Sequence, residues 1–302
     1  MLISVIILTF NEEVHIERCI KSARLISDSI YVIDSYSTDA TVRLASEAGV
    51  NVLQRAFDSH FNQFNWALTK IKNCDWVVRL DADEYFTPQL VESMRSTRTL
   101  TDPTVYGYAF QRRMTFLNKL IKFGGVFPIE VVRMFRYGHG TIESRLMDEH
   151  IIVSGLVKTL QGEIIDDSRK SLNWWISKHN HYSSLEALEV LTSAGAVDTT
   201  SKFDGETAFR RQLKRVYQSC PISVRSLFYF VYRYLFRFGF RDGFYGFLFH
   251  FYQGFWYRLM VDSKIRLVLD FQQGLSRDAS TLELSEMLDL PESLVQSKFG
   301  PL

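Results

Sequence analysis

Two aspartates, Asp81 and Asp83, stand two positions apart directly after the apolar run 76–80. In an extended segment, side chains at positions i and i+2 point to the same side, so both carboxylates can reach one ion. Hard cations such as Mg²⁺ bind one or two carboxylates together with substrate phosphates. The spacing therefore indicates a divalent-metal site, although the tripeptide taken alone is also typical of a solvated turn.

The chain before these aspartates alternates between strand-like apolar runs and helical patterns. Strands are predicted over residues 1–9, 29–33, 50–53 and 75–80, and the segments between them carry apolar residues at helical spacing. This alternation predicts an α/β fold with a mostly parallel sheet flanked by helices on both faces.

Polar clusters follow three of these predicted strands, at 9–11, 34–39 and 81–83. In parallel sheets of this kind, ligands bind at the carboxyl ends of the strands. Because these ends meet at one edge of the sheet, the three clusters predict a single site.

The three motifs together resemble those of a known family. They read SVIILTFNEE at 4–13, VIDSYSTDAT at 32–41 and RLDADE at 79–84. In this order and spacing they resemble family 2 glycosyltransferases, and most closely the bacterial subgroup with lipopolysaccharide-core glycosyltransferases of the WaaE/KdtX type. The resemblance implies a GT-A fold and an inverting, metal-dependent transfer from a nucleotide-diphosphate sugar.

The same resemblance implies a role for each motif residue. Thr9, Asn11 and Glu12 would line the base and ribose pocket, and Asp34 would contact the nucleobase. Asp81 would also contact the donor diphosphate.

The metal and the phosphates have their own expected partners. Asp81 and Asp83 would hold Mg²⁺ or Mn²⁺ beside the diphosphate. The family often has a basic residue within the stretch that matches 61–65, where this chain has only neutral residues. The donor phosphates are therefore expected to depend on Arg55, on Arg79 or on the metal.

A second pair of carboxylates, Asp148 and Glu149, is the candidate general base. Inverting transfer requires a base that takes the proton of the attacking hydroxyl. The resemblance favours Glu149, with Asp148 as the second candidate. In the alternative interpretation, one of the two only pairs with Arg145 or His150.

Composition excludes several other classes of protein. The net charge of +1 over 302 residues gives no global field for nucleic acid, which is not an expected partner. The three cysteines show no paired spacing, and the initial apolar run has neither a basic leader nor a cleavage site. A cytoplasmic protein is expected.

A second unusual region covers residues 228–257, where seventeen of the thirty residues are Phe, Tyr or Trp. Arg233, Arg237 and Arg241 interrupt the run, so a membrane-spanning helix is not expected. Aromatic rings beside arginines suit the headgroup layer of a membrane. The alternative is that these helices cap the sheet or form an oligomer interface.

The sequence thus predicts three parts: a catalytic GT-A domain at 1–165, an acceptor- and membrane-associated helical extension at 166–269, and a polar tail at 270–302 with one weak helix. The expected function is sugar transfer to a bacterial glycan, either lipopolysaccharide core or a lipid-linked saccharide, on the inner face of the plasma membrane. The alternative is a non-catalytic, sugar-binding or scaffold subunit with the same fold.

Overall fold

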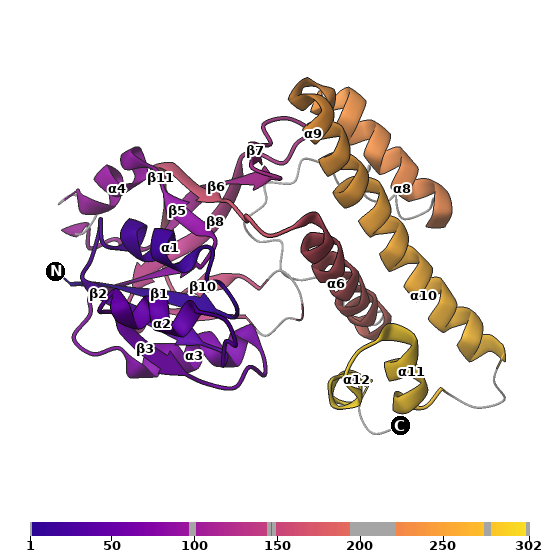
Figure 1. Cartoon of the computed structure of the whole chain (residues 1–302), viewed down its shortest axis with the longest axis horizontal. Coiled ribbons are helices and arrows are strands. Elements are labelled where there is room, and N and C mark those ends of the chain that lie inside the picture. Colours follow the sequence, from indigo (N-terminus) through magenta and orange to yellow (C-terminus); the bar gives the residue numbers. More distant parts are fainter. Residues whose placement is uncertain are drawn as a thin grey trace. The chain divides into compact units, whose positions relative to one another are not determined.

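The computed structural model of the chain describes residues 2–96, 101–143, 146, 149–193, 222–274 and 279–299. The chain divides into two compact units, 1–171 and 172–302. The division falls slightly after the predicted boundary at residue 165, because residues 167–170 bond back to the first unit. Figure 1 shows the elements of both units in chain order.

The first unit begins with the predicted alternation of strands and helices. The elements are β1 (Ile3–Thr9), α1 (Ile16–Ala23), β2 (Ser29–Asp34), α2 (Thr41–Glu47), β3 (Asn51–Gln54), α3 (His60–Lys70) and β4 (Trp76–Asp81). Strands β3, β2, β1 and β4 pair in parallel. The predicted α/β fold is confirmed.

The rest of the first unit extends and closes this sheet. It comprises β5 (Glu84–Phe86), α4 (Pro88–Arg95), β6 (Val105–Phe116), β7 (Lys119–Leu120), β8 (Ile129–Arg136), β9 (Gly140–Ile142), β10 (Ile151–Val153) and β11 (Leu156–Asp166). The strand order is β3-β2-β1-β4-β8-β6-β11-β5, with β8 antiparallel to β4 and β6. Strands β9 and β10 form a separate hairpin.

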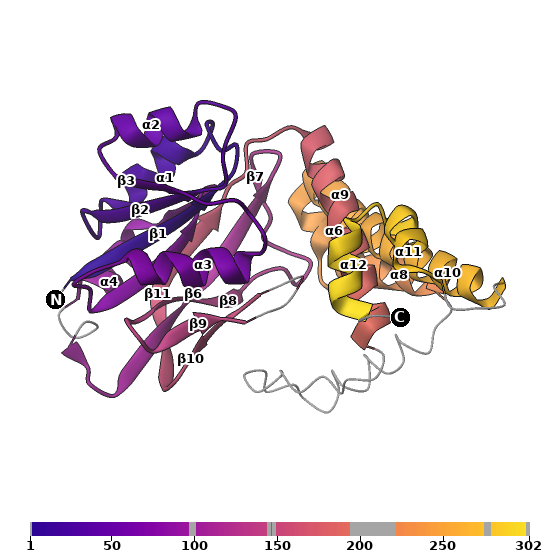
Figure 2. The ribbon, with the colours of Figure 1, turned by 90° about the horizontal axis from the view of Figure 1, so that it is seen from below.

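Both faces of the sheet are covered, which explains why β1 is apolar throughout. Alternate residues of β1 enter two buried clusters: Val5 packs with Ile20 of α1, and Ile6 packs with Phe64 of α3. Side chains of successive strand residues point to opposite faces, so only a strand buried on both sides needs such a run. Figure 2 shows α2 and α3 on opposite sides of the sheet.

The strand register brings the predicted polar clusters to one edge. Thr9 pairs with Asp34 across β1 and β2, and Leu8 pairs with Asp81 across β1 and β4. At the far side of the sheet, Asp166 at the end of β11 pairs with Glu84. The ends of β1, β2, β4 and β11 thus share an edge.

The second unit is helical, as predicted for the extension. It contains α6 (Leu172–Ser193), α8 (Ile222–Val231), the π-helical η1 (Tyr232–Phe236), the 3₁₀-helical η2 (Gly239–Asp242), α9 (Gly243–Phe249), the π-helical η3 (His250–Trp256) and α10 (Tyr257–Gly274). Within the described part of the chain, every helix is too short or too polar to cross a bilayer.

The C-terminal segment holds more helix than the sequence suggested. Helices α11 (Thr281–Leu288) and α12 (Glu292–Phe299) follow α10, where one weak helix was expected. A capping box at Ser280 and Glu283 starts α11, and Leu284 and Leu288 are buried. The reciprocal cap satisfies two amide groups at the helix start, so this short helix is defined locally.

Candidate active site

The carboxylate of Asp34 anchors the loops after β1 and β2. It is fully buried and accepts hydrogen bonds from Thr9 Oγ1 (3.3 Å), the Ser37 amide (2.9 Å) and Gln54 Nε2 (3.0 Å). The Ser37 hydroxyl bonds to it as well. Thr9 and Asp34 are thus brought together as predicted, and Asp34 fixes the turn after β2.

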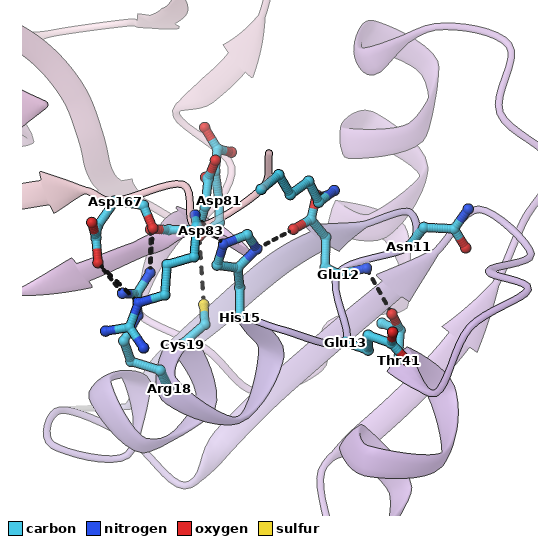
Figure 3. Close-up of polar contacts among 12 residues, drawn as sticks. Asn11, Glu12, Glu13, His15, Arg18, Cys19, Thr41, Asp81, Asp83 and Asp167 are labelled. Carbon is cyan, nitrogen blue, oxygen red and sulfur yellow. Dashed lines mark hydrogen bonds and ion pairs between the residues drawn. The ribbon is translucent and has the colours of Figure 1, made fainter. Parts of the chain in front are cut away.

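Asn11 joins the loop after β1 to the loop after β2. Its amide donates to Ser37 Oγ (2.8 Å), and its side-chain oxygen accepts from the Thr38 amide (2.8 Å). The backbone of Asn11 has a positive φ of 53°, a conformation that asparagine tolerates better than most residues. Figure 3 shows Asn11 directed away from the aspartates of the third motif.

Glu12 lies between the two loops and the chain segment after β11. Its carboxylate contacts His15 Nδ1 (2.6 Å) and Lys170 Nζ (2.7 Å), while its amide donates to Thr41 Oγ1 (2.7 Å). His15 is buried, and its Nε2 accepts from the Arg169 amide (2.8 Å). Nδ1 of His15 therefore carries the proton that is donated to Glu12 (Figure 3).

The turn that carries Asp81 and Asp83 differs from the extended segment predicted for it. β4 ends at Asp81, residues 82 and 83 form a turn, and β5 starts at Glu84. The i and i+2 rule for strands therefore does not apply to this pair. The turn instead places both Asp81 and Asp83 at the edge of the sheet (Figure 3).

Arg133 of β8 is the buried counter-charge of this turn. One of its terminal nitrogens lies 2.8 Å from Asp81 Oδ2 and 2.6 Å from Glu84 Oε1. Arg79 Nε lies 3.1 Å from the other oxygen of Asp81. Glu84 is 1 % exposed and also accepts the Asp81 amide (2.9 Å).

The two carboxyl groups beside Arg133 have opposite pKa shifts. Burial opposes ionisation of Asp81, but the charges of Arg133 and Arg79 outweigh it and hold the pKa of Asp81 well below its usual range. Burial raises the pKa of Glu84 to about 7, since the charge of Asp81 adds to burial and together they outweigh Arg133. Asp81 is therefore the permanent anion of the pair.

These residues fit a divalent cation that is shared with a substrate. Among the described residues, no three His, Cys, Asp or Glu side chains are placed to hold a metal by themselves. Asp81 accepts two hydrogen bonds from arginines and keeps acceptor sites free, because a carboxylate offers about four. Asp81 and Asp83 would supply the carboxylates, and a bound diphosphate the remaining oxygens.

A second ion-pair group braces the Asp83 turn from the side of α1. Arg18 donates to the carbonyl oxygens of Asp83 (2.9 Å) and Asp167 (2.7 Å), and it pairs with the Asp167 carboxylate (Figure 3). The Asp167 amide donates to the same Asp83 carbonyl (3.0 Å). The backbone of Asp83 is thus held from two elements.

The two candidate arginines for the donor phosphates occupy different places. Arg55 follows β3 and donates to the Asn62 carbonyl (2.6 Å) and to Asp58 (3.0 Å). Arg79 is buried and bonded to Asp81. Arg79 therefore lies directly at the Asp81–Asp83 turn, while Arg55 lies at the end of β3 with a partly exposed side chain.

The candidate base Glu149 lies in the loop of the β9–β10 hairpin, and its side chain is half-buried. Asp148 and Arg145 lie outside the described residues. His150 pairs with Glu143 (2.8 Å), a third carboxylate that the sequence analysis did not consider. The hairpin packs through Ile151 on the same buried cluster as Leu8, which directly precedes Thr9.

Two further residues of this site, Glu84 and Arg133, could have been singled out from the sequence. Glu84 directly follows the aspartate pair, and Arg133 stands between the apolar pairs Val131–Val132 and Met134–Phe135 of β8. A buried arginine requires a buried counter-charge, so its position predicts an acidic partner without naming it. Nothing local to Arg18 or Asp167 indicates that they pair across 149 positions.

The fold and the edge geometry define an α/β protein with polar loops and an acidic turn at the carboxyl ends of its strands. Residues 4–136 match the family model described as "Glycosyl transferase family 2". The match covers the part of the chain that holds all three motifs, which resemble the same family.

Curated relatives are named as glycosyltransferases. An uncharacterized glycosyltransferase of Rickettsia bellii (strain RML369-C) is 39% identical over 92 residues, which are 30% of this chain and 31% of the relative. The lipopolysaccharide core biosynthesis glycosyltransferase LpsC of Rhizobium meliloti (strain 1021) is 27% identical over 192 residues, 61% of this chain and 70% of LpsC.

A solved structure is also similar over part of the chain. It is glucosyl-3-phosphoglycerate synthase from Mycobacterium tuberculosis, in complex with Mn²⁺, uridine diphosphate and phosphoglyceric acid. It is 26% identical with a TM-score of 0.31, and the match covers 37% of this chain and 43% of that chain. The chain thus spans less than half of this protein and less than a third of the Rickettsia bellii relative.

Proposed function

We propose that this chain is an inverting glycosyltransferase that moves a sugar from a nucleotide-diphosphate donor to a bacterial glycan. The observation that carries the proposal is the shared edge: the loops around Asn11 and Asp34 and the turn at Asp81 and Asp83 lie at the ends of adjacent parallel strands. The family match over 4–136 supports the same reaction class.

In this proposal the chain prepares a site for a leaving nucleoside diphosphate. Arg133 and Arg79 keep Asp81 ionised and oriented, while Arg18 and Asp167 hold the backbone of Asp83. Mg²⁺ or Mn²⁺ bound there would stabilise the negative charge that develops on the diphosphate as the glycosidic bond breaks.

The loops after β1 and β2 would bind the nucleoside of the donor. Thr9 and Asp34 are buried, so they would hold the loops in shape, and the exposed surface of the loops would meet the base and ribose. Asn11 and Glu12 stand at the start of the loop after β1, and they are the proposed polar contacts to the base and ribose. The exposed Tyr36 in the second loop offers a ring for stacking.

Glu149 is the proposed general base, with Asp148 as the second candidate. The carboxylate would take the proton from the acceptor hydroxyl as that oxygen attacks the anomeric carbon of the donor sugar. The bond from the sugar to the diphosphate breaks in the same step, so the configuration at this carbon inverts.

We further propose a lipopolysaccharide-core or lipid-linked acceptor, met at the cytoplasmic face of the membrane. The LpsC likeness supports the first. Residues 235–247 expose rings such as Phe236 (70 %) and Phe244 (68 %), together with Arg237 and Arg241. Exposed aromatic rings beside arginines suit a membrane surface with anionic headgroups.

The test is a binding panel of nucleotide sugars measured by calorimetry, with and without Mn²⁺. The proposal expects one nucleotide to bind with metal dependence, and hydrolysis of that donor to follow. Binding without any hydrolysis or transfer would favour the alternative of a non-catalytic sugar-binding subunit. The absence of binding to every nucleotide sugar would contradict the proposal.

A further inference from the structure

We propose that His15 and Lys170 are positioning residues that hold the carboxylate of Glu12 in place for the ribose hydroxyls of the donor. This inference rests on the proposed function and deepens it with two residues that lie outside the three sequence motifs. His15 stands at the start of α1, and Lys170 follows β11 near the end of the first unit. Lys170 thus reaches Glu12 across 158 positions of the chain.

His15 is bonded through both ring nitrogens, and this arrangement fixes its tautomer. The side chain is buried, its Nε2 accepts from the Arg169 amide (2.8 Å), and its Nδ1 lies 2.6 Å from an oxygen of Glu12. Because a backbone amide can only donate, Nε2 has to keep its lone pair, and the proton of the neutral ring is on Nδ1. The Arg169 amide therefore directs the proton of His15 toward Glu12 (Figure 3).

The carboxylate of Glu12 is held at both of its oxygens. Oε2 lies 2.6 Å from His15 Nδ1, and Oε1 lies 2.7 Å from Lys170 Nζ. A carboxylate offers about four acceptor sites, so these two contacts leave roughly two for a ligand. The side chain of Glu12 is 16 % exposed, so a ligand can reach it. Because its two contacts already fix the side chain, binding a ligand costs little further ordering.

A pair of adjacent hydroxyl groups is the chemistry that fits these acceptor sites. The 2′- and 3′-hydroxyls of a ribose can both donate to one carboxylate, and acidic residues bind ribose hydroxyls in other nucleotide-binding α/β folds. Glu12 stands in the loop after β1, which Asn11 joins to the loop after β2. A site built to bond a hydroxyl group rejects the analogue that lacks it. A fixed Glu12 should therefore distinguish a ribose from a 2′-deoxyribose.

The two ring nitrogens of His15 can be replaced one at a time. In His15→Asn, the side-chain amide lies near the place of Nδ1 and can still donate to Glu12. In His15→Gln, the longer side chain brings an amide oxygen to the place of Nε2, where it can accept from Arg169, but the donor to Glu12 is lost. Lys170→Met removes the second contact of Glu12, and Lys72→Met, an exposed lysine before β4, is its matched control.

Calorimetry in Mn²⁺ measures the binding of UDP, GDP, ADP and CDP and of their 2′-deoxy analogues. Wild type, His15→Asn and Lys72→Met should bind one ribonucleotide about tenfold more tightly than its 2′-deoxy analogue, as expected for a hydrogen bond to a charged group. His15→Gln and Lys170→Met should lose most of this preference, because their ribonucleotide affinity falls toward that of the analogue. A general loss of structure would instead weaken both ligands alike.

A wild type without a ribose preference would overturn the inference, as would a preference that His15→Gln and Lys170→Met keep, or an equal loss of both ligands in these variants. If His15→Gln fails to fold by circular dichroism, Lys170→Met decides together with NMR of the wild-type His15 ring, where a proton on Nε2 in place of Nδ1 would contradict the assignment.

The outcomes also separate the inference from the proposed function. The expected ribose preference in a protein that transfers and hydrolyses no donor sugar would support the inference and favour the non-catalytic alternative. Unchanged preference in the variants of an active enzyme would refute the inference alone. A wild type that binds none of the nucleotides would refute both.

Discussion

The surroundings of Arg133 in the first unit and residues 235–247 of the second unit treat polar and apolar side chains in opposite ways. In the first unit, charged groups are buried: the side chain of Arg133 is 6 % exposed and that of Glu84 is 1 % exposed. In residues 235–247 of the second unit, large aromatic rings are exposed, as in Phe236 and Phe244. Both arrangements cost free energy in an isolated protein, through desolvation in the first case and hydrated apolar surface in the second.

The two arrangements differ in the contacts that offset their free-energy cost. The buried charges of the first unit are compensated internally, because Arg133 contacts two carboxylates and Arg18 contacts two carbonyls and a carboxylate. The rings of 235–247 contact neighbouring rings, as Phe244 does Tyr245, but Phe236 and Phe244 stay 70 % and 68 % exposed. The surroundings of Arg133 therefore have the character of a pre-formed site, whereas residues 235–247 are the part for which we propose contact with a membrane surface.

The largest expected effect separates catalysis from fold in the first unit. Asp83→Asn should lower kcat by about a thousandfold, because charge stabilisation of the leaving group is lost. The unfolding midpoint should stay near that of wild type, since the backbone carbonyl of Asp83 still accepts from Arg18. Asp28→Asn, an exposed carboxylate at the start of β2, is the matched control.

The second effect concerns the general base. Glu149→Gln should reduce kcat by about a hundredfold while the affinity for the donor is kept, as expected when proton transfer is lost. Asp148→Asn, measured in the same steady-state assay, should change kcat far less. Full turnover in both variants would remove the hairpin loop from the mechanism.

The third effect tests whether Arg133 stabilises the buried carboxyl groups of Asp81 and Glu84. Arg133→Met should destabilise the protein by about 3–5 kcal/mol, because it leaves Asp81 and Glu84 beside each other without their counter-charge. Urea unfolding measures this change. Combining Arg133→Met with Glu84→Gln should recover part of the loss, and a double variant as unstable as the sum of both single changes would argue against coupling.

The fourth effect is a dependence of stability on pH. The pKa of Glu84 is raised to about 7 in the folded state, so the folded state binds the proton more tightly than the unfolded state. The contribution of this group is complete below its unfolded pKa and is lost as the pH rises through 7. Urea unfolding from pH 5 to pH 8 should show this fall in wild type and not in Glu84→Gln.

The smallest expected effect concerns the exposed aromatic rings of the second unit. Exchanging Phe236 or Phe244 for Ser should weaken binding to anionic lipid vesicles by about tenfold each, since burial of a Phe side chain contributes roughly 1.5–3 kcal/mol. Leu267→Ser, an exposed apolar residue on α10, is the control and should leave vesicle sedimentation unchanged. Equal sedimentation of all variants would favour another role for the aromatic surface.

Much of the first unit was predictable because its signals are local. Apolar runs and helical spacing placed β1 to β4, and the sheet topology then brought Thr9, Asp34 and Asp81 to one edge. The identity of the motifs added the chemistry. Periodicity and motif order are properties of short segments, so one sequence is sufficient to recognise them.

The supporting contacts could not be predicted in the same way. Arg133 meets Glu84 across 49 positions, and Arg18 meets Asp167 across 149. Such pairs depend on how distant strands and helices pack, which local patterns do not contain. The turn at Asp83 also departed from the expected strand, because the chain must reverse to place β5 beside β11.

The most direct test of the central claim is Mn²⁺-dependent release of nucleoside diphosphate from the donor, compared between wild type and Asp83→Asn. The account predicts that wild type releases diphosphate only with the metal, and that Asp83→Asn releases almost none although it folds normally. Release by Asp83→Asn at the wild-type rate, or release that does not depend on metal, would contradict the assignment of the Asp81–Asp83 turn.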